Sequence, residues 1–424
     1  MKMTKLSLVA AMAMTAAFAG GDIAPVEPVV EACNADTTIN GKAQAYYFTN
    51  NQGLSYRGNN RSMFEADSSD LGLAVTLDVS HKIYDGITAN VSAVGYLNTM
   101  NGHSAINGFE STGVDAINAA IAPLSIDRKD AGAFINVANI TATFGDTTFV
   151  LGRQLLNTPM LSGFDWLLAP GSFEAYTLVN TSIENVTFIA SYVEEWRPNN
   201  LDDTWVNLSD ASDGDNWTVS AAYNNDALKA SIWYYNIDAG FAIRPEAYTQ
   251  VYVDAGYNFG SFALDAMYVN TDYSNTPAGL SVDASDAYGI KATATLGSVE
   301  LMAAYVNVSD NVVGFVGAMD NLYTSSWNSN TSLSIGDNFK VEASTTLWDV
   351  RASASYAYYE YDNNDIIDFD NGQEIDVILG YDITNCISVD AIYTNTNYGY
   401  TGNANLLGDT ENVDALELIA TYKF

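Results

Sequence analysis

The chain has 424 residues, with 16 Lys and Arg against 51 Asp and Glu, so its formal net charge is −35 at pH 7. Such a charge makes nucleic acid an unlikely partner, because phosphates are bound by an excess of Lys and Arg. Two His and two Cys give little material for zinc sites or His-dependent triads. There is also no G-x-S-x-G elbow, phosphate loop or dinucleotide fingerprint. We therefore expect no enzyme.

The first residues have the layout of a secretory signal. Lys2 and Lys5 precede an apolar run, which ends at a small-x-small site formed by residues 17–19. The sequence predicts a signal peptide over 1–19 and an extended periplasmic extension over 20–37. No later stretch approaches 18 uncharged apolar residues, so a β-barrel is the remaining way to cross a membrane.

Alternation of apolar and polar residues predicts β-strands throughout 38–424. In the segment 246–258, for example, Val251 and Val253 share one face, while Gln250 and Asp254 share the other. Eighteen segments of this kind can be read: 38–49, 70–80, 86–98, 131–143, 146–153, 173–181, 185–196, 217–224, 227–237, 246–258, 260–271, 285–296, 298–308, 338–347, 349–361, 373–383, 386–396 and 413–424.

Short and long connections alternate between these segments, and a soluble β-sandwich does not require this. Gly145 and Gly297 are short connections, whereas 99–130 and 309–337 are long. The alternation predicts an all-β fold: a transmembrane antiparallel β-barrel of about 18 strands with short periplasmic turns and long extracellular loops. Many of the 27 Tyr and 7 Trp lie near segment ends, as expected for interfacial aromatic girdles. A secreted soluble all-β protein is the alternative.

The stretch FVLGRQLLNTPMLSGFDWLLAPGSFEAY, residues 149–176, resembles the strand 5, constriction loop and strand 6 region of OprD-like porins of the Opr family. The resemblance implies an eighteen-stranded barrel, commonly a homotrimer, that lets small hydrophilic solutes cross the outer membrane of Gram-negative bacteria. It also places a constriction loop at 154–172. The final Phe424 resembles the C-terminal signal that barrel-insertion machinery recognises. The strongly basic lumen ladder of the carboxylate-specific members is missing from the sequence.

Charged residues of this region are candidates for tuning a pore. Four side chains at the predicted constriction would set a transverse field on permeating solutes, or would only pin the loop to the wall: Arg153, Asp165, Trp166 and Glu174. Elsewhere, Asp254 and Glu417 fall on the predicted lumen face. Together with the excess of acids, they predict a preference for cations.

Acidic loops and the two cysteines raise two further expectations. Asp210, Asp213 and Asp215 supply oxygen ligands for calcium without EF-hand spacing, and solvated acidic loops are the alternative. Cys33 and Cys386 are both expected on the periplasmic side, where a disulfide is allowed, and two unpaired thiols are the alternative.

These features favour a passive, water-filled, outer-membrane channel for ions and small hydrophilic solutes. A substrate-specific porin for a small organic solute is one alternative. The second alternative is a structural or adhesive surface protein, in which the barrel would merely serve as the membrane anchor. Outer-membrane lipid, barrel-insertion machinery and two further copies of the chain are the expected partners, with no cofactor beyond the calcium candidates.

Overall fold

The computed structural model describes residues 36–51, 62–65, 68–99, 131–163, 165, 167–199, 205–208, 215–238, 247–274, 283–317, 320–360, 371–397 and 412–424. The predicted signal peptide, Cys33, Trp166, Asp210 and Asp213 lie outside these ranges. Within them, no helix is both long enough and apolar enough to cross a membrane.

The secondary structure consists almost entirely of strands. The first half of the chain contains β1 (Thr37–Asn50), β2 (Ser69–Tyr84), β3 (Ile87–Asn98), β4 (Ala131–Phe144), β5 (Thr147–Gln154), β6 (Leu161–Ser162), β7 (Ser172–Asn180), β8 (Val186–Arg197), β9 (Val206–Asn207) and β10 (Asn216–Asn224). The second half contains β11 (Leu228–Ile237), β12 (Ala247–Asn258), β13 (Phe262–Ser274), β14 (Ser285–Leu296), β15 (Val299–Ser309), β16 (Val316–Gly317), η2 (Thr331–Leu333), β17 (Gly336–Leu347), β18 (Val350–Tyr359), β19 (Gly372–Thr384), β20 (Ile387–Asn397) and β21 (Val413–Lys423).

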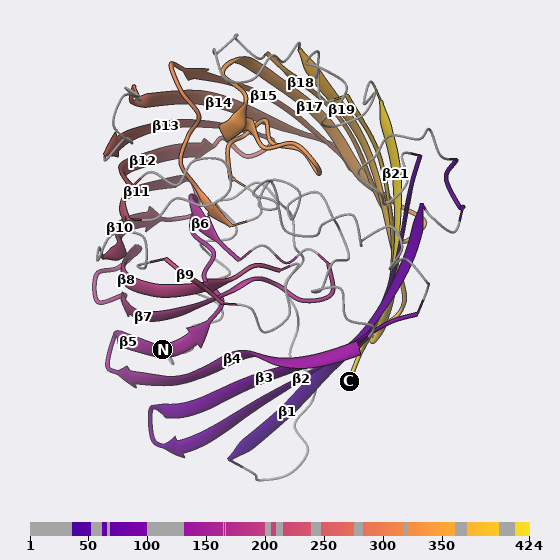
Figure 1. Ribbon diagram of the computed structural model, residues 1–424. Coiled ribbons are helices and arrows are strands. Elements are labelled where there is room, and N and C mark those ends of the chain that lie inside the picture. Colours follow the sequence, from indigo (N-terminus) through magenta and orange to yellow (C-terminus); the bar gives the residue numbers. More distant parts are fainter. Residues whose placement is uncertain are drawn as a thin grey trace.

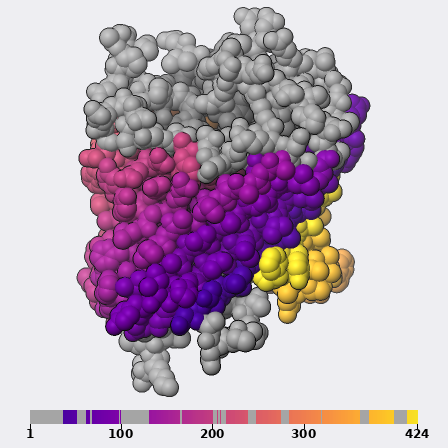
Figure 2. Space-filling model, turned by 60° about the horizontal axis from the view of Figure 1, so that its bottom comes forward, coloured from indigo at the N-terminus to yellow at the C-terminus, as the bar shows by residue number. Residues whose placement is uncertain are grey.

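Eighteen of these strands form a closed antiparallel barrel (Figure 1). Strand β1 pairs with β2 along one edge and with β21 along the other, which closes the ring. In Figure 2 the yellow C-terminal strand accordingly lies beside the indigo N-terminal strands. The predicted segments coincide with the barrel strands to within a few residues. The short strands β6, β9 and β16 were not predicted.

Alternation sorts the side chains of each strand between the two faces of the barrel. Large apolar side chains are strongly exposed on the outer face, as expected where lipid replaces water. Examples are Val75, Leu151, Ile232, Ile290, Val341, Leu379 and Leu418. Polar and charged side chains dominate the inner face, including Gln44, Asp254, Lys291 and Asp376. Asp254 and Glu417 face inward as predicted, but they are only 4% and 1% exposed.

The closing seam depends on the last residue. The amide of Gly41 in β1 donates to the carbonyl of Phe424 at 2.8 Å, and the amide of Phe424 donates back at 2.9 Å. The aromatic ring of Phe424 lies over Gly41, since a Cβ at position 41 would be 2.5 Å from its Cζ atom. Tyr422 follows the same outer face, with its ring centroid 5.8 Å from that of Phe424. Gly41 of β1, which has no side chain, therefore leaves the space that the ring of Phe424 occupies.

Replacing Gly41 with Val should weaken this seam. The new side chain needs the space that the Phe424 ring occupies, and overpacking of this kind typically costs about 1–3 kcal/mol. We expect the folded band in semi-native gel electrophoresis to be lost at a lower temperature. Gly95→Val is the matched control, because Gly95 also faces outward but has no atom within 4 Å of the added Cβ position. Equal unfolding temperatures for the two variants would contradict the role of the seam.

Candidate functional site

Two long connections fold into the barrel and contact each other inside it. Loop A comprises residues 155–171 between β5 and β7, and loop B comprises residues 310–335 between β15 and β17. Strand β6 of loop A pairs in parallel with β16 of loop B, and the amide of Val316 donates to the carbonyl of Met160 at 2.9 Å. Figure 1 shows β6 and the orange loop B segment within the ring of strands. The expectation that 154–172 enters the lumen agrees with this arrangement, whereas loop B was not predicted to do so.

Side-chain hydrogen bonds join the two loops to each other and to the wall. The side-chain amide of Asn321 in loop B donates to the carbonyls of Thr158 and Pro159 in loop A, at 3.1 and 2.9 Å. The hydroxyl of Tyr235, from β11, donates to Thr158 Oγ1 at 3.1 Å and accepts from the amide of Met160 at 3.3 Å. The loops therefore form one assembly anchored to the wall.

The second half of loop A crosses to the opposite side of the barrel. Its apolar segment packs on the inner faces of β1 to β4 and β21, in a buried cluster of Leu167, Leu168, Ala169, Tyr46, Phe48, Ala74, Val94, Tyr96, Phe134 and Ala415. Beside this segment, Asp165 lies 3.9 Å from the ammonium group of Lys42. Of the three constriction candidates that the structure describes, Asp165 is thus the one that lies in the lumen.

A buried arginine fixes the end of loop A. The guanidinium of Arg197, at the end of β8, is fully buried and donates to the side-chain oxygen of Asn136 at 2.8 and 3.0 Å. It also donates to the carbonyl of Pro170, and it lies 4.4 Å from the centroid of the Phe134 ring. A buried arginine requires partners of this kind, because an uncompensated buried charge is strongly destabilising.

Loop B is held together internally by Asp320. The carboxylate of this buried residue accepts hydrogen bonds from the amide of Leu322 at 3.0 Å, the amide of Ser332 at 2.7 Å and the hydroxyl of Ser325. Burial raises the pKa of the Asp320 carboxyl, and the three donors oppose this shift. The carboxylate thus accepts hydrogen bonds from loop amides that have no backbone carbonyl as a partner.

The tip of loop B is bound by carboxylates of the wall. Glu374 of β19 accepts from the amide of Asn328 at 2.7 Å and from the hydroxyl of Ser329 at 2.6 Å. Glu417 of β21 accepts from the indole of Trp327 at 2.9 Å, and Asp376 accepts from the amide of Trp327 at 3.3 Å. All three carboxylates are nearly inaccessible. These acids therefore position a loop and do not present their charge directly to the aqueous path.

Charged side chains on the inner wall form several ion pairs below and beside the loops. Lys229 lies 2.7 Å from Asp265, and Lys291 lies 3.9 Å from the other oxygen of the same carboxylate. Lys340 pairs with Glu342 at 3.5 Å. The inward basic residues on the described strands are Lys42, Lys82, Lys229, Lys291, Lys340, Arg351 and Lys423, together with the guanidinium of Arg197. The inward acidic residues are Asp70, Asp78, Asp254, Asp265, Glu300, Glu342, Glu374, Asp376, Asp382, Asp390 and Glu417.

Two constriction candidates lie on the other side of the wall. Arg153 shares its face with the exposed Leu151, and Glu174 shares its face with the exposed Tyr176, so both point outward. They form an ion pair at 3.4 Å, and Arg153 lies 4.2 Å from the centroid of the Trp205 ring. The interpretation of these two residues as lining the pore is therefore wrong. The residue that points inward at the end of β5 is Gln154.

The remaining candidates are placed only in part. Asp215 accepts a hydrogen bond from the hydroxyl of Tyr192 at 2.9 Å, while its proposed calcium co-ligands Asp210 and Asp213 lie outside the described residues. Among the described residues no cluster of three metal-binding side chains occurs. Cys386 is half-buried beside the turn between β19 and β20, and Cys33 is outside the described part, so the disulfide stays a prediction.

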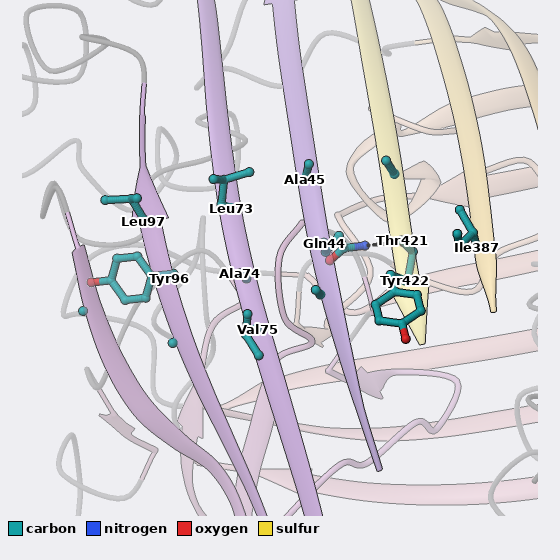
Figure 3. A pocket seen from close by; sticks show the side chains of 14 residues that line it. Gln44, Ala45, Leu73, Ala74, Val75, Tyr96, Leu97, Ile387, Thr421 and Tyr422 are labelled. Atoms are coloured by element: carbon teal, nitrogen blue, oxygen red, sulfur yellow. Dashed lines mark hydrogen bonds between the residues drawn. The ribbon is translucent and has the colours of Figure 1, made fainter. Parts of the chain in front are cut away.

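One hollow on the described surface is unrelated to the lumen. It measures about 680 Å³ and lies across β21, β1, β2 and β3 (Figure 3). The labelled side chains of Leu97, Leu73, Ala45 and Tyr422 line it from these four strands. These residues belong to the apolar outer face, so the hollow faces lipid and not the path of a solute.

Removing residues 162–168 of loop A should widen the channel. The deletion takes away the pairing of Ser162 with Gly317 and the packing of Leu167 and Leu168 on the wall, so the lumen gains open cross-section. We expect larger single-channel conductance and entry of larger sugars in liposome swelling. The unfolding temperature on gels reports whether the barrel remains intact. Unchanged conductance in a folded deletion variant would show that loop A does not restrict the path.

Comparisons with known proteins agree with this geometry. Several solved outer-membrane structures share the fold, and each aligns over 92% of this chain. OpdK of Pseudomonas aeruginosa matches with 14% identity over 98% of its own length and a TM-score of 0.71. OccAB3 of Acinetobacter baumannii matches with 14% identity over 100% of its length and a TM-score of 0.72.

OccK2 (OpdF) of P. aeruginosa, solved in complex with glucuronate, matches with 14% identity over 98% of its length and a TM-score of 0.68. No curated protein matches the chain. The sequence model of the Gram-negative porins matches residues 7–326, well over half of the chain. The polar inner wall, the two inward loops and this match lead to one conclusion: the chain belongs to the Gram-negative porin family and is an outer-membrane channel protein.

Proposed function

We propose that the protein is a passive diffusion channel for ions and small hydrophilic solutes. The observation that carries this proposal is the closed barrel with a polar inner wall, narrowed by loops A and B, which are fixed to each other and to the wall. A fixed constriction selects solutes by size and charge and requires no reaction. A barrel that only anchored a surface protein would not conduct, so current through the purified protein in a planar bilayer tests the proposal directly.

The channel should prefer cations. Inward-facing acids outnumber inward-facing bases on the described strands, and the whole chain carries a formal charge of −35. The tip-binding acids Asp376 and Glu417 are buried under loop B, but their negative potential still extends into the lumen, because a low-dielectric wall screens it poorly. Moderate cation selectivity is the expected result.

Reversal potentials in a salt gradient measure this preference. At about 0.1 M salt, where the Debye length is about 10 Å, we expect the sign of the potential to indicate cation flux. Near 1 M salt the potential should approach zero, because the Debye length falls to about 3 Å. Preference for anions at the lower concentration would refute the charge assignment and leave the channel function intact.

A channel specific for a small organic acid is the second candidate. Lys229, Lys291 and Lys340 all face inward, and the structurally similar OccK2 was solved with glucuronate. In this case a sugar acid would bind transiently in the lumen and interrupt the current. Millimolar glucuronate should then raise current noise through the wild-type channel, while neutral glucose at the same concentration should not. Identical noise with both sugars would exclude this candidate.

Three finer assignments complete the proposal. We infer a homotrimer because the stretch 149–176 resembles OprD-like porins, and chemical cross-linking in native membranes measures the number of copies. Barrel-insertion machinery is the proposed partner of Phe424 during biogenesis. Calcium is proposed for the acidic loop that ends at Asp215, and isothermal titration with calcium after chelator treatment tests it.

A further inference from the structure

Two inward glycines separate a basic residue from an acidic residue in the cross-strand register. Lys229 of β11 is opposite Gly256 of β12, and Gly256 is opposite Asp265 of β13. The same order recurs on the other side of the barrel, where Arg351 of β18 is opposite Gly380 of β19. Gly380 is in turn opposite Asp390 of β20. In both rows the charged partners come from strands that are not adjacent to each other.

Each ion pair is formed directly above its glycine. The ammonium group of Lys229 is 2.7 Å from Asp265 Oδ1, and a Cβ at position 256 would lie 2.5 Å from Lys229 Cε and 2.1 Å from that oxygen. Arg351 Nη2 is 3.5 Å from Asp390 Oδ1, while its Nη1 forms a closer ion pair with Asp382 of β19. A Cβ at position 380 would lie 2.7 Å from both Arg351 Nη2 and Asp390 Oδ1. A side chain of any size at either position therefore occupies the space of the ion pair.

The backbone does not explain these glycines. Neither Gly256 nor Gly380 has a positive φ angle, in contrast to turn residues such as Gly145, where φ is 60°. Any L-residue can adopt the extended conformation of these two strands, and glycine in a strand interior is intrinsically unfavourable. Glycine is therefore required for steric reasons. A long basic side chain lies across the backbone at each position and leaves no space for a Cβ atom.

We propose that Gly256 and Gly380 determine the ion selectivity of the channel. Each lets a cationic side chain cross one strand to a carboxylate, so that its charge is partnered at the wall of the lumen. Asp265 has the larger share of this role, because its carboxylate also lies 3.9 Å from Lys291. The inference rests on the proposed channel function and adds the residues that keep the lumen lysines from attracting anions.

Planar-bilayer measurements on Gly256→Ala and Gly380→Ala test this proposal. Displacing Asp265 releases Lys229 toward the lumen, so the cation-to-anion permeability ratio of Gly256→Ala at about 0.1 M salt should fall at least about twofold. The fall should be smaller in Gly380→Ala, because Arg351 keeps its ion pair with Asp382. Gly95→Ala, on the open outer face, should behave as the wild type. A wild-type protein that does not conduct refutes the channel function. A conducting wild type with equal ratios in both glycine variants refutes the present inference alone.

The double variant Gly256→Ala/Lys229→Gln separates charge release from general distortion. If the freed ammonium group causes the shift, removing it should restore at least the wild-type ratio. A double variant that stays as anion-shifted as Gly256→Ala would overturn the proposal. The corresponding pair at the second site is Gly380→Ala/Arg351→Gln.

A chemical readout covers the case in which a variant does not insert into bilayers. In detergent-folded protein, a water-soluble amine-acylating reagent should modify Lys229 at least about threefold faster in Gly256→Ala than in the wild type, because an ion-paired ammonium group is protected. Lys82, at the exposed end of β2 and ion-paired with Asp85, is the internal reference in the same peptide digest. Equal rates at Lys229 in folded wild type and variant would count against release of the lysine.

Discussion

The pairing of β1 with both β2 and β21 is the constraint on which the rest of the structure depends. In hydrocarbon no water is present to satisfy a free backbone amide or carbonyl, and each unsatisfied group costs several kcal/mol. A sheet with an open edge is therefore excluded, and the last residues must reach the first strand. The glycine at position 41 makes this possible, because the terminal ring needs the space above it. Closure then fixes which face of every strand meets lipid. Most charged side chains of the strands accordingly face inward, and the outward Arg153 and Glu174 neutralise each other in an ion pair.

The need to satisfy every buried backbone group also explains the position of several acidic residues of the barrel wall. Loops A and B enter a narrow lumen, where their backbone groups cannot all be solvated, so the wall has to supply partners. Glu374, Asp376 and Glu417 do this for the tip of loop B, and Asp320 does it within the loop. Carboxylates suit the task because each accepts several hydrogen bonds from neutral donors. The net charge of the chain is consequently a poor measure of the charge that a solute meets, since part of it is committed to holding a loop.

The sequence predicted the barrel well and its interior poorly. Period-two alternation is a local property, and the unequal connections reveal which strand ends share a rim, so the eighteen strands and their order were accessible. Arg153 and Glu174 were misassigned because a one-residue difference in phase moves a side chain to the opposite face. The preceding inward residue, Gly152, has no side chain to reveal the phase. Loop B was missed for a different reason: its inward fold depends on a pairing with β6 that spans more than 150 residues and leaves no local pattern.

The row of Lys229, Gly256 and Asp265 shows why contacts inside the lumen cannot be read from any single segment of the sequence. Lys229 and Asp265 are 36 positions apart, with a glycine between them in register but not in any sequence motif. Their contact exists because the pairing registers of β11 with β12 and of β12 with β13 set the relative heights of the three strands. An additional residue in the short turn after β12 would shift the register of β13 by one and rotate its inward residues to the lipid face. Selectivity in this channel is therefore encoded jointly by charged residues, by the glycines between them and by the lengths of periplasmic turns that no solute contacts.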